Sequence, residues 1–374
     1  MNNVIYIALD VHKNNIVAGL SRSAGESMIL GEYVNTATGL KQLIKILHKI
    51  QEECDEIQIC YEAGPCGYEV KRLLEKNGYL CQVIAPSLIP QRSGDRIKTD
   101  KRDALKLARL FRAGELTPIA VPTELQESVR DLVRCREDMS RALMSARQKA
   151  NHFLVRHGYF YEGRNWTKGY FMWMKKIEFE NKYLKETMNQ YIDQIEHLYF
   201  QLDDIDREIA AVAETEEYKL KVNALRAYRG LSTLSAMVII TEIFTFSRFK
   251  NAPEFMSYLG VVPSEYSSGG SVMKGSLTKC GNKRVRRILV EAALHNRHEP
   301  KTSYAMRANL NKVDSELRNP PLKAMKRLHK RYYHLIFAGK PKPKAAAAVA
   351  RELAGFIWHS MIIVESRIVN NQAA

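Results

Sequence analysis

The sequence of 374 residues has few cysteines, no paired cysteine motif and no long apolar segment. Its six cysteines are scattered without any Cys-x-x-Cys pair, which argues against a structural zinc site and favours the reducing cytoplasm. No apolar run reaches the length that spans a bilayer, so we expect no membrane segment. The apolar N-terminus is interrupted by Asp10 and lacks a basic leader and a small-residue cleavage site. We therefore expect a buried strand there and not a signal peptide.

Acidic residues are scarce in one long stretch of the C-terminal part. Residues 270–351 contain 20 Lys or Arg but only 4 Asp or Glu, a surplus of 16 that equals the net charge of the whole chain. A basic surface of this kind binds polyanions through counterion release, with an affinity that falls as salt rises. Aromatic and hydroxyl side chains are interleaved with the basic ones, which favours nucleic acid over a merely solvated helical surface. The charge does not distinguish DNA from RNA.

Apolar patterning predicts an α/β domain up to about residue 115. Short apolar runs and helical periodicity alternate there, with strands expected at 4–9, 15–20, 28–34, 57–61 and 79–84 and helices at 39–51, 68–76 and 99–113. Three hairpin-linked strands followed by β-α-β crossovers give a mixed sheet flanked by helices.

The remainder of the chain is predicted to be mostly helical. Long helices are expected at 124–156 and 171–218, and the second repeats apolar residues at steps of three and four, which fits a coiled-coil seam: Tyr191, Ile195, Leu198, Leu202, Ile205, Ile209 and Val212. A Ser- and Gly-rich loop at 264–275, an extended linker at 339–344 and a last apolar helix at 345–369 follow. We therefore expect three parts: an α/β catalytic domain (1–115), a helical coiled-coil or dimerisation arm (116–220) and a mostly α C-terminal domain (221–374).

Four acidic residues occupy the ends of elements in the α/β domain. Asp10 ends the first strand and Glu62 ends the first crossover strand, so the two can lie side by side. Asp100 and Asp103 share one face of a helix that Thr99 is placed to cap. Grouped carboxylates repel one another unless a cation such as Mg²⁺ joins them, and two ions about 4 Å apart can clamp a phosphodiester. Taken singly, each acid also has a purely structural explanation, such as a favourable charge at a helix N-terminus.

Three segments around these acids, IALDVHK, YEAGPCGYEV and IKTDKRDALKLARL, resemble the insertion-sequence family 110 transposases of the DEDD type. The resemblance implies a ribonuclease-H-like, Holliday-junction-resolvase-like domain in which Asp10, Glu62, Asp100 and Asp103 bind the metal. Two C-terminal segments are similar to the same family: AYRGLSTLSAMVIITEI to its helix-hairpin-helix segment, and FMSYLGVVPSEYSSGGSVMKGSLTKCGNKRVRRILVEAA to its second transposase domain.

The family places a serine nucleophile in the Ser- and Gly-rich loop. Alignment through Pro263, Tyr266 and Gly269 puts it on Ser268, with Ser267 as the alternative. Serine attack on a phosphodiester gives a covalent phosphoserine that conserves bond energy for rejoining. Without the resemblance, serines in a Gly-rich turn are ordinary turn formers.

Basic side chains after this loop are candidates to hold DNA phosphates: Lys274, Lys279, Arg284 and Arg287. One position departs from the family, because Ser232 stands where its helix-hairpin-helix turn has a second glycine. This departure argues against backbone binding of a phosphate at that turn.

The sequence thus predicts a cytoplasmic, Mg²⁺-dependent transposase that cuts and rejoins DNA. Because the acidic residues and Ser268 are far apart in sequence, we hypothesise a composite site between protomers of a dimer or tetramer. The resemblance also implies a structured guide RNA encoded by the element, a bridge RNA that pairs with target and donor DNA.

Three alternatives remain. One is a metal-dependent junction nuclease that uses water, with a structural Ser268. Another is a phosphotransferase of the sugar-kinase type, disfavoured because no glycine follows Asp10 closely. The last is a nucleic-acid-binding protein without catalysis.

Overall fold

The computed structural model describes residues 3–91, 99–268 and 271–373. The chain divides into two compact units, Met1–Pro122 and Thr123–Ala374, here called unit 1 and unit 2. The predicted division into a helical coiled-coil or dimerisation arm (116–220) and a C-terminal domain (221–374) stays a proposal; residues 116–122 of that predicted arm lie in unit 1.

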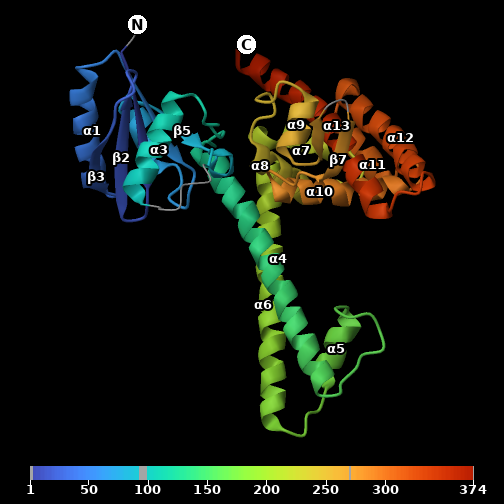
Figure 1. Cartoon of the computed structure of the whole chain (residues 1–374). Coiled ribbons are helices and arrows are strands. Elements are labelled where there is room, and N and C mark those ends of the chain that lie inside the picture. The colour runs from blue at the N-terminus through green and yellow to red at the C-terminus, as the bar shows by residue number, and fades with distance from the viewer. Residues whose placement is uncertain (1–2, 92–98, 269–270, 374) are drawn as a thin grey trace. The chain divides into compact units, whose positions relative to one another are not determined.

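Unit 1 contains a five-stranded sheet in the order β3-β2-β1-β4-β5 (Figure 1). Its elements are β1 (Val4–Val11), β2 (Asn15–Arg22), β3 (Ser27–Val34), α1 (Ala37–Gln51), β4 (Glu56–Glu62), α2 (Glu69–Lys76), β5 (Leu80–Ile84), a 3-10 turn (Pro86–Leu88) and α3 (Asp100–Arg112). The first three strands are antiparallel neighbours, whereas β1, β4 and β5 run parallel. The predicted mixed sheet is confirmed, while the ribonuclease-H-like assignment stays a prediction.

Helices cover both faces of this sheet, which is why its central strands are almost continuously apolar. Apolar residues of α1 and α2 pack on one face with Ile7 and Leu9 of β1, and α3 packs on the other face with Ala8. The approach of α3 is close, because a Cβ on Gly19 of β2 would lie 2.7 Å from the carbonyl oxygen of Ala104. This contact holds the N-terminal end of α3 beside the sheet.

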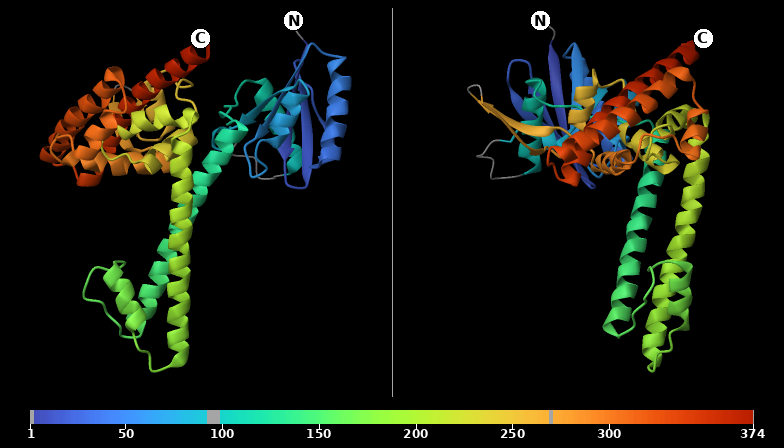
Figure 2. Two further views of the ribbon diagram at one scale, coloured as in Figure 1. Left: turned by 180° about the vertical axis from the view of Figure 1, so that it is seen from behind. Right: turned by 90° about the vertical axis from the view of Figure 1, so that its right-hand side faces the viewer.

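Over its described residues, unit 2 consists of helices and one hairpin. Its elements are α4 (Glu124–Arg156), α5 (Lys168–Lys176), α6 (Lys182–Ala213), α7 (Glu216–Arg226), α8 (Thr233–Ile243), α9 (Ala252–Tyr258), β6 (Pro263–Ser268), β7 (Ser271–Leu277), α10 (Lys283–Leu294), a 3-10 turn (His295–Arg297), α11 (Tyr304–Leu310), α12 (Ser315–Phe337) and α13 (Lys342–Ala373). Helices α4 and α6 lie side by side and extend away from the other helices, with α5 near their far end (Figure 2). We call this pair the arm.

The arm was predicted only in part. Helix α4 has the predicted bounds, because a capping box fixes its start: the Thr123 side chain accepts the N–H of Gln126, whose side chain accepts the N–H of Thr123. The predicted second helix at 171–218 is wrong, since the structure has three helices there, α5, α6 and α7. The Asn181 side chain accepts the N–H of Tyr183 and begins α6 anew, although the apolar spacing continues across the break. Several predicted seam residues, among them Ile195, are buried, but a coiled coil stays a proposal.

Two other expectations for unit 2 are corrected. Strands β6 and β7 pair antiparallel within the predicted loop at 264–275, and the linker at 339–344 already contains the first turn of α13. Pro343 lies in that turn, where proline is tolerated because the first N–H groups of a helix have no partner within it.

Helix α13 is long and apolar enough over Lys342–Asn370 to cross a membrane by length and composition, contrary to the expectation that no segment is. Its buried side chains, among them Val349 and Leu353, belong to the main core of unit 2, and the helix packs on α10 and α12. This is the behaviour of a core helix.

Candidate functional site

The predicted acids gather at one edge of the unit 1 sheet. Strands β1 and β4 are parallel neighbours in which Leu9 lies opposite Tyr61. The residues that follow, Asp10 and Glu62, therefore lie at the carboxyl ends of adjacent strands. Helix α3 begins at Asp100 because the Thr99 side chain caps it, and its packing on β1 and β2 brings that end to the same edge.

A histidine joins two of the acids. His12 Nε2 is 3.2 Å from Asp10 Oδ1 and 3.8 Å from Asp100 Oδ1. One ligand atom from each of these three side chains lies within 4.8 Å of the others. His12 was not among the predicted site residues; the signal that could have indicated it is its place two residues after Asp10, just past the end of β1. Glu62 is exposed and, among the described residues, lies outside this group of three.

The carboxylates at this edge repel one another. Partial burial raises the pKa of Asp10 above its ordinary value, and the negative charges of Asp100 and Asp103 add to the rise. His12 lowers the same pKa in part, through its charge and its hydrogen bond. A carboxylate that is partly removed from water and surrounded by other carboxylates is stabilised by a cation. The carboxylate oxygens fit a divalent ion such as Mg²⁺ or Mn²⁺, and the imidazole of His12 is placed to orient one of these carboxylates, that of Asp10.

The predicted serine loop is a hairpin that exposes apolar side chains. Strands β6 and β7 pair Tyr266 with Met273, and these two side chains are 77% and 69% exposed. A two-stranded hairpin with so little burial is marginally stable by itself, so contact with a binding partner would stabilise it. The Ser267 hydroxyl donates a hydrogen bond of 2.7 Å to Glu265. The backbone of Ser268 ends β6, but its side chain lies outside the described residues.

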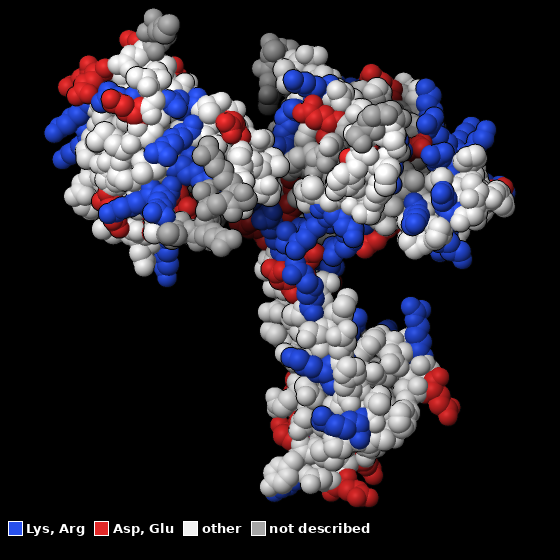
Figure 3. Space-filling view, viewed as in Figure 1, with Lys and Arg blue, Asp and Glu red and all other residues white. Residues whose placement is uncertain are grey.

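The four predicted phosphate contacts fall into two kinds. Lys274 and Lys279 are exposed on and just after the hairpin. Arg284 and Arg287 contact a carboxylate of the arm, since their guanidinium groups lie 2.5 Å and 3.0 Å from Glu137. The role of all four residues as phosphate contacts stays a prediction. Figure 3 shows Lys and Arg side chains gathered where the arm meets the other helices of unit 2 and over α11 and α12.

The turn between α7 and α8 also has a defined role in packing. Gly230 has a φ of +84°, and a Cβ there would meet Ala292 of α10 at 3.0 Å. Ser232, in place of the family's second glycine, caps α8 by accepting the N–H of Ser235. Its hydroxyl thus occupies the end of the helix at which a phosphate would bind.

Comparison with known proteins covers both regions. A model of the transposase family IS116/IS110/IS902 matches residues 222–307, which include the hairpin. A second transposase model, of the DEDD type from the IS110 group, matches residues 7–158, which include all four predicted acids.

Relatives match along nearly the whole chain. A putative transposase, y4qE, of Sinorhizobium fredii is 38% identical over 94% of this chain and 87% of its own length. The transposase for insertion sequence element IS1533 of Leptospira borgpetersenii is 32% identical over 92% of this chain and 99% of its own length.

Proposed function

The chain belongs to the IS110 family of transposases, and on that premise we propose that it cuts and rejoins DNA with an acidic Mg²⁺ site and a serine nucleophile, Ser268. The observation that carries the proposal is the convergence of Asp10, His12 and Asp100 at one sheet edge. The DEDD type implies use of a divalent metal, and the oxygen-rich donor set favours Mg²⁺.

Asp10, Glu62, Asp100 and Asp103 would hold the ion, and His12 would orient Asp10. A bound divalent ion supplies charge stabilisation to the phosphodiester and to the leaving oxygen. In the serine step, the Ser268 hydroxyl oxygen bonds to phosphorus, the bond from phosphorus to one deoxyribose oxygen breaks, and that oxygen takes up the serine proton. A hydroxyl of a second strand then displaces the serine by the reverse reaction, so no external energy source is needed.

The test of the serine step is the covalent intermediate. Incubation with DNA of the element ends should give a protein–DNA adduct that survives denaturing electrophoresis and maps to the peptide with Ser268. An active Ser268→Ala protein together with no adduct would favour the hydrolytic junction nuclease instead.

We further propose that the protein binds a structured guide RNA and assembles as a dimer or tetramer. We place it in the cytoplasm. The basic surplus of residues 270–351 supports binding of nucleic acid, and the six unpaired cysteines support a reducing compartment. Sequencing of the RNA that copurifies with the protein tests the proposed guide RNA, whose sequence should match DNA next to the gene.

A mixture of Asp10→Asn and Ser268→Ala proteins should recover activity if protomers share a site.

Lys274 and Lys279 should contribute to DNA affinity through phosphate contacts. Replacing either with alanine should lower the slope of log affinity against log salt by about 1, because each contact releases roughly one counterion. Fluorescence anisotropy with labelled duplex at several salt concentrations measures this slope. Lys41→Ala, an exposed change on α1, serves as the control. An unchanged slope in both hairpin variants would remove these lysines from the interface.

His12→Ala should weaken binding of Mg²⁺ and Mn²⁺ by about 10-fold or more, because residues that orient a metal ligand contribute that much to affinity. Calorimetric titration of the DNA-free protein measures the affinity. The neighbouring exposed residue gives the control, Lys13→Ala. Equal affinities for both variants would show that the contact of His12 with Asp10 has no part in metal binding.

A further inference from the structure

The base of the β6–β7 hairpin is tied to the segment that precedes it. The N–H of Thr278, just after β7, donates to the carbonyl of Val262 at 3.0 Å. The N–H of Lys279 donates to the carbonyl of Gly260 at 3.2 Å. The first and last residues of the hairpin therefore lie side by side where it joins the helices of unit 2.

Arg286 of α10 closes the same base. Its Nη1 donates to the carbonyl oxygens of Leu259 and Cys280, at 2.9 Å each, so one guanidinium holds the chain before and after the hairpin. Gly281 has a φ of +73°, and a Cβ there would lie 1.8 Å from the carbonyl oxygen of Tyr258. Backbone packing this close permits little movement of the hairpin base.

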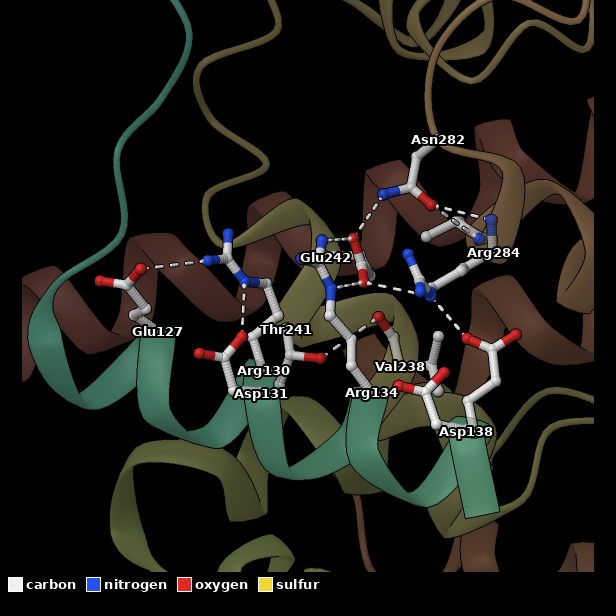
Figure 4. Close-up of polar contacts among 12 residues, drawn as sticks. Glu127, Arg130, Asp131, Arg134, Asp138, Val238, Thr241, Glu242, Asn282 and Arg284 are labelled. Atoms are coloured by element: carbon white, nitrogen blue, oxygen red, sulfur yellow. Dashed lines mark hydrogen bonds and ion pairs between the residues drawn. The ribbon is translucent and has the colours of Figure 1, made fainter. Parts of the chain in front are cut away.

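A buried carboxylate lies next to this base. Glu242, at the end of α8, is only 5% exposed. Arg134 of the arm donates two parallel hydrogen bonds to it, of 2.8 and 2.9 Å, and Asn282 donates a third of 2.6 Å (Figure 4). Burial alone would raise the pKa of Glu242, but Arg134, with Asn282 and Arg284, outweighs it and holds the pKa below its ordinary value.

Asn282 joins that carboxylate to the helix that follows the hairpin. Its Nδ2 donates to Glu242, while its Oδ1 accepts the N–H groups of Arg284 and Val285 and so caps α10. One amide therefore fixes the first turn of α10 relative to α8 and, through Arg134, to the arm.

Stabilisation of the fold is a weak explanation for this arrangement. Buried ion pairs often contribute less to stability than apolar residues of the same volume, because both charges lose their hydration. The backbone beside Glu242 is also strained, since Phe244 has a φ of +63° and a ψ of −65°. Residues held in such conformations cluster where a fold must fix a particular geometry.

We propose that Glu242 and Asn282 are positioning residues that fix the hairpin base and thereby the reach of its serine toward DNA. The inference rests on the proposed function, because it assigns these residues to the serine step. Neither residue contacts the reacting atoms; both act through the hairpin base and the start of α10. A displacement of about 1 Å in a positioned nucleophile costs on the order of 10²-fold in rate.

The test uses Asn282→Asp, which keeps an oxygen to cap α10 but turns a second carboxylate toward Glu242. The rate of adduct formation in a single turnover should fall about 10²-fold, with DNA affinity unchanged. Hydrogen exchange at the amides of Thr278 and Lys279 should become faster. Asn282→Ser keeps an oxygen to cap α10 and a hydroxyl that can donate to Glu242, so this variant should retain most of the rate. Asn181→Asp, the same change at the cap of α6, is the control and should alter neither quantity.

Slower adduct formation and faster exchange at the hairpin base in Asn282→Asp, with most of the rate retained in Asn282→Ser, together support the proposal. Unchanged rate and exchange in Asn282→Asp would overturn it, as would an equal loss of rate in Asn282→Asp and Asn282→Ser that follows a lower melting temperature in both. If the wild-type chain forms no adduct, the serine mechanism fails. The exchange measurement on the DNA-free protein still decides whether Glu242 and Asn282 fix the hairpin.

Discussion

Replacing Asp10 with asparagine is expected to lower the rate of DNA strand cleavage by about 10³-fold while the fold is retained. Asparagine keeps the shape of the side chain but removes the charge that attracts the cation. Loss of metal-assisted charge stabilisation costs several kcal/mol, and each 1.36 kcal/mol is a factor of about ten in rate. Asp10 ends a buried strand, yet it lies at the sheet edge, so the substitution leaves the apolar core untouched.

The same substitution is expected to raise the melting temperature of the metal-free protein. The pKa of Asp10 is raised on folding by burial and by the neighbouring carboxylates, so its ionised form is less favourable in the folded than in the unfolded state. Above both pKa values this difference lowers the free energy of unfolding, and asparagine removes the cost.

Cleavage of end-labelled DNA and thermal unfolding with increasing Mg²⁺ measure the two effects. The wild-type melting temperature should rise with the metal, and that of Asp10→Asn should not. Glu52→Gln, an exposed acid at the end of α1, should behave as the wild type in both assays. Cleavage by Asp10→Asn at near the wild-type rate would exclude a metal role for this edge.

The sheet and the position of its acids were predictable because local patterns determine them. Apolar runs bounded by turn residues mark the strands, and a strand that ends on Asp10 predicts a polar group at the sheet edge. Parallel pairing of β1 with β4 then follows from the crossover through α1, which brings Glu62 to the same edge.

The features that were not predicted depend on contacts between distant residues or, around α6, on a single local cap. The contact of Arg284 with Glu137, a residue 147 positions earlier, was not predicted, because no local pattern indicates such a contact. The breaks around α6 were missed because apolar spacing continues through them, and only the Asn181 cap marks the start of the helix. His12 was missed because its proximity to Asp100 exists only once α3 has packed on the sheet.

Ser268→Ala should abolish the covalent protein–DNA adduct and lower strand transfer by at least about 10⁴-fold, since loss of a serine nucleophile costs up to about 10⁶-fold in other enzymes. Nothing in the alanine side chain can form the bond to phosphorus. DNA affinity should stay within about twofold, because one hydroxyl contributes little to a contact dominated by phosphate charges.

The matched comparison is Ser267→Ala, one residue earlier on the same strand. We expect that variant to retain the adduct, but the opposite result has a physical basis. The Ser267 hydroxyl already donates to Glu265, and a carboxylate beside a hydroxyl is the arrangement that activates a serine. An adduct that is lost in Ser267→Ala and in Glu265→Gln but kept in Ser268→Ala would move the nucleophile to Ser267. Loss in Ser268→Ala alone would leave the Ser267–Glu265 pair as a local contact within β6.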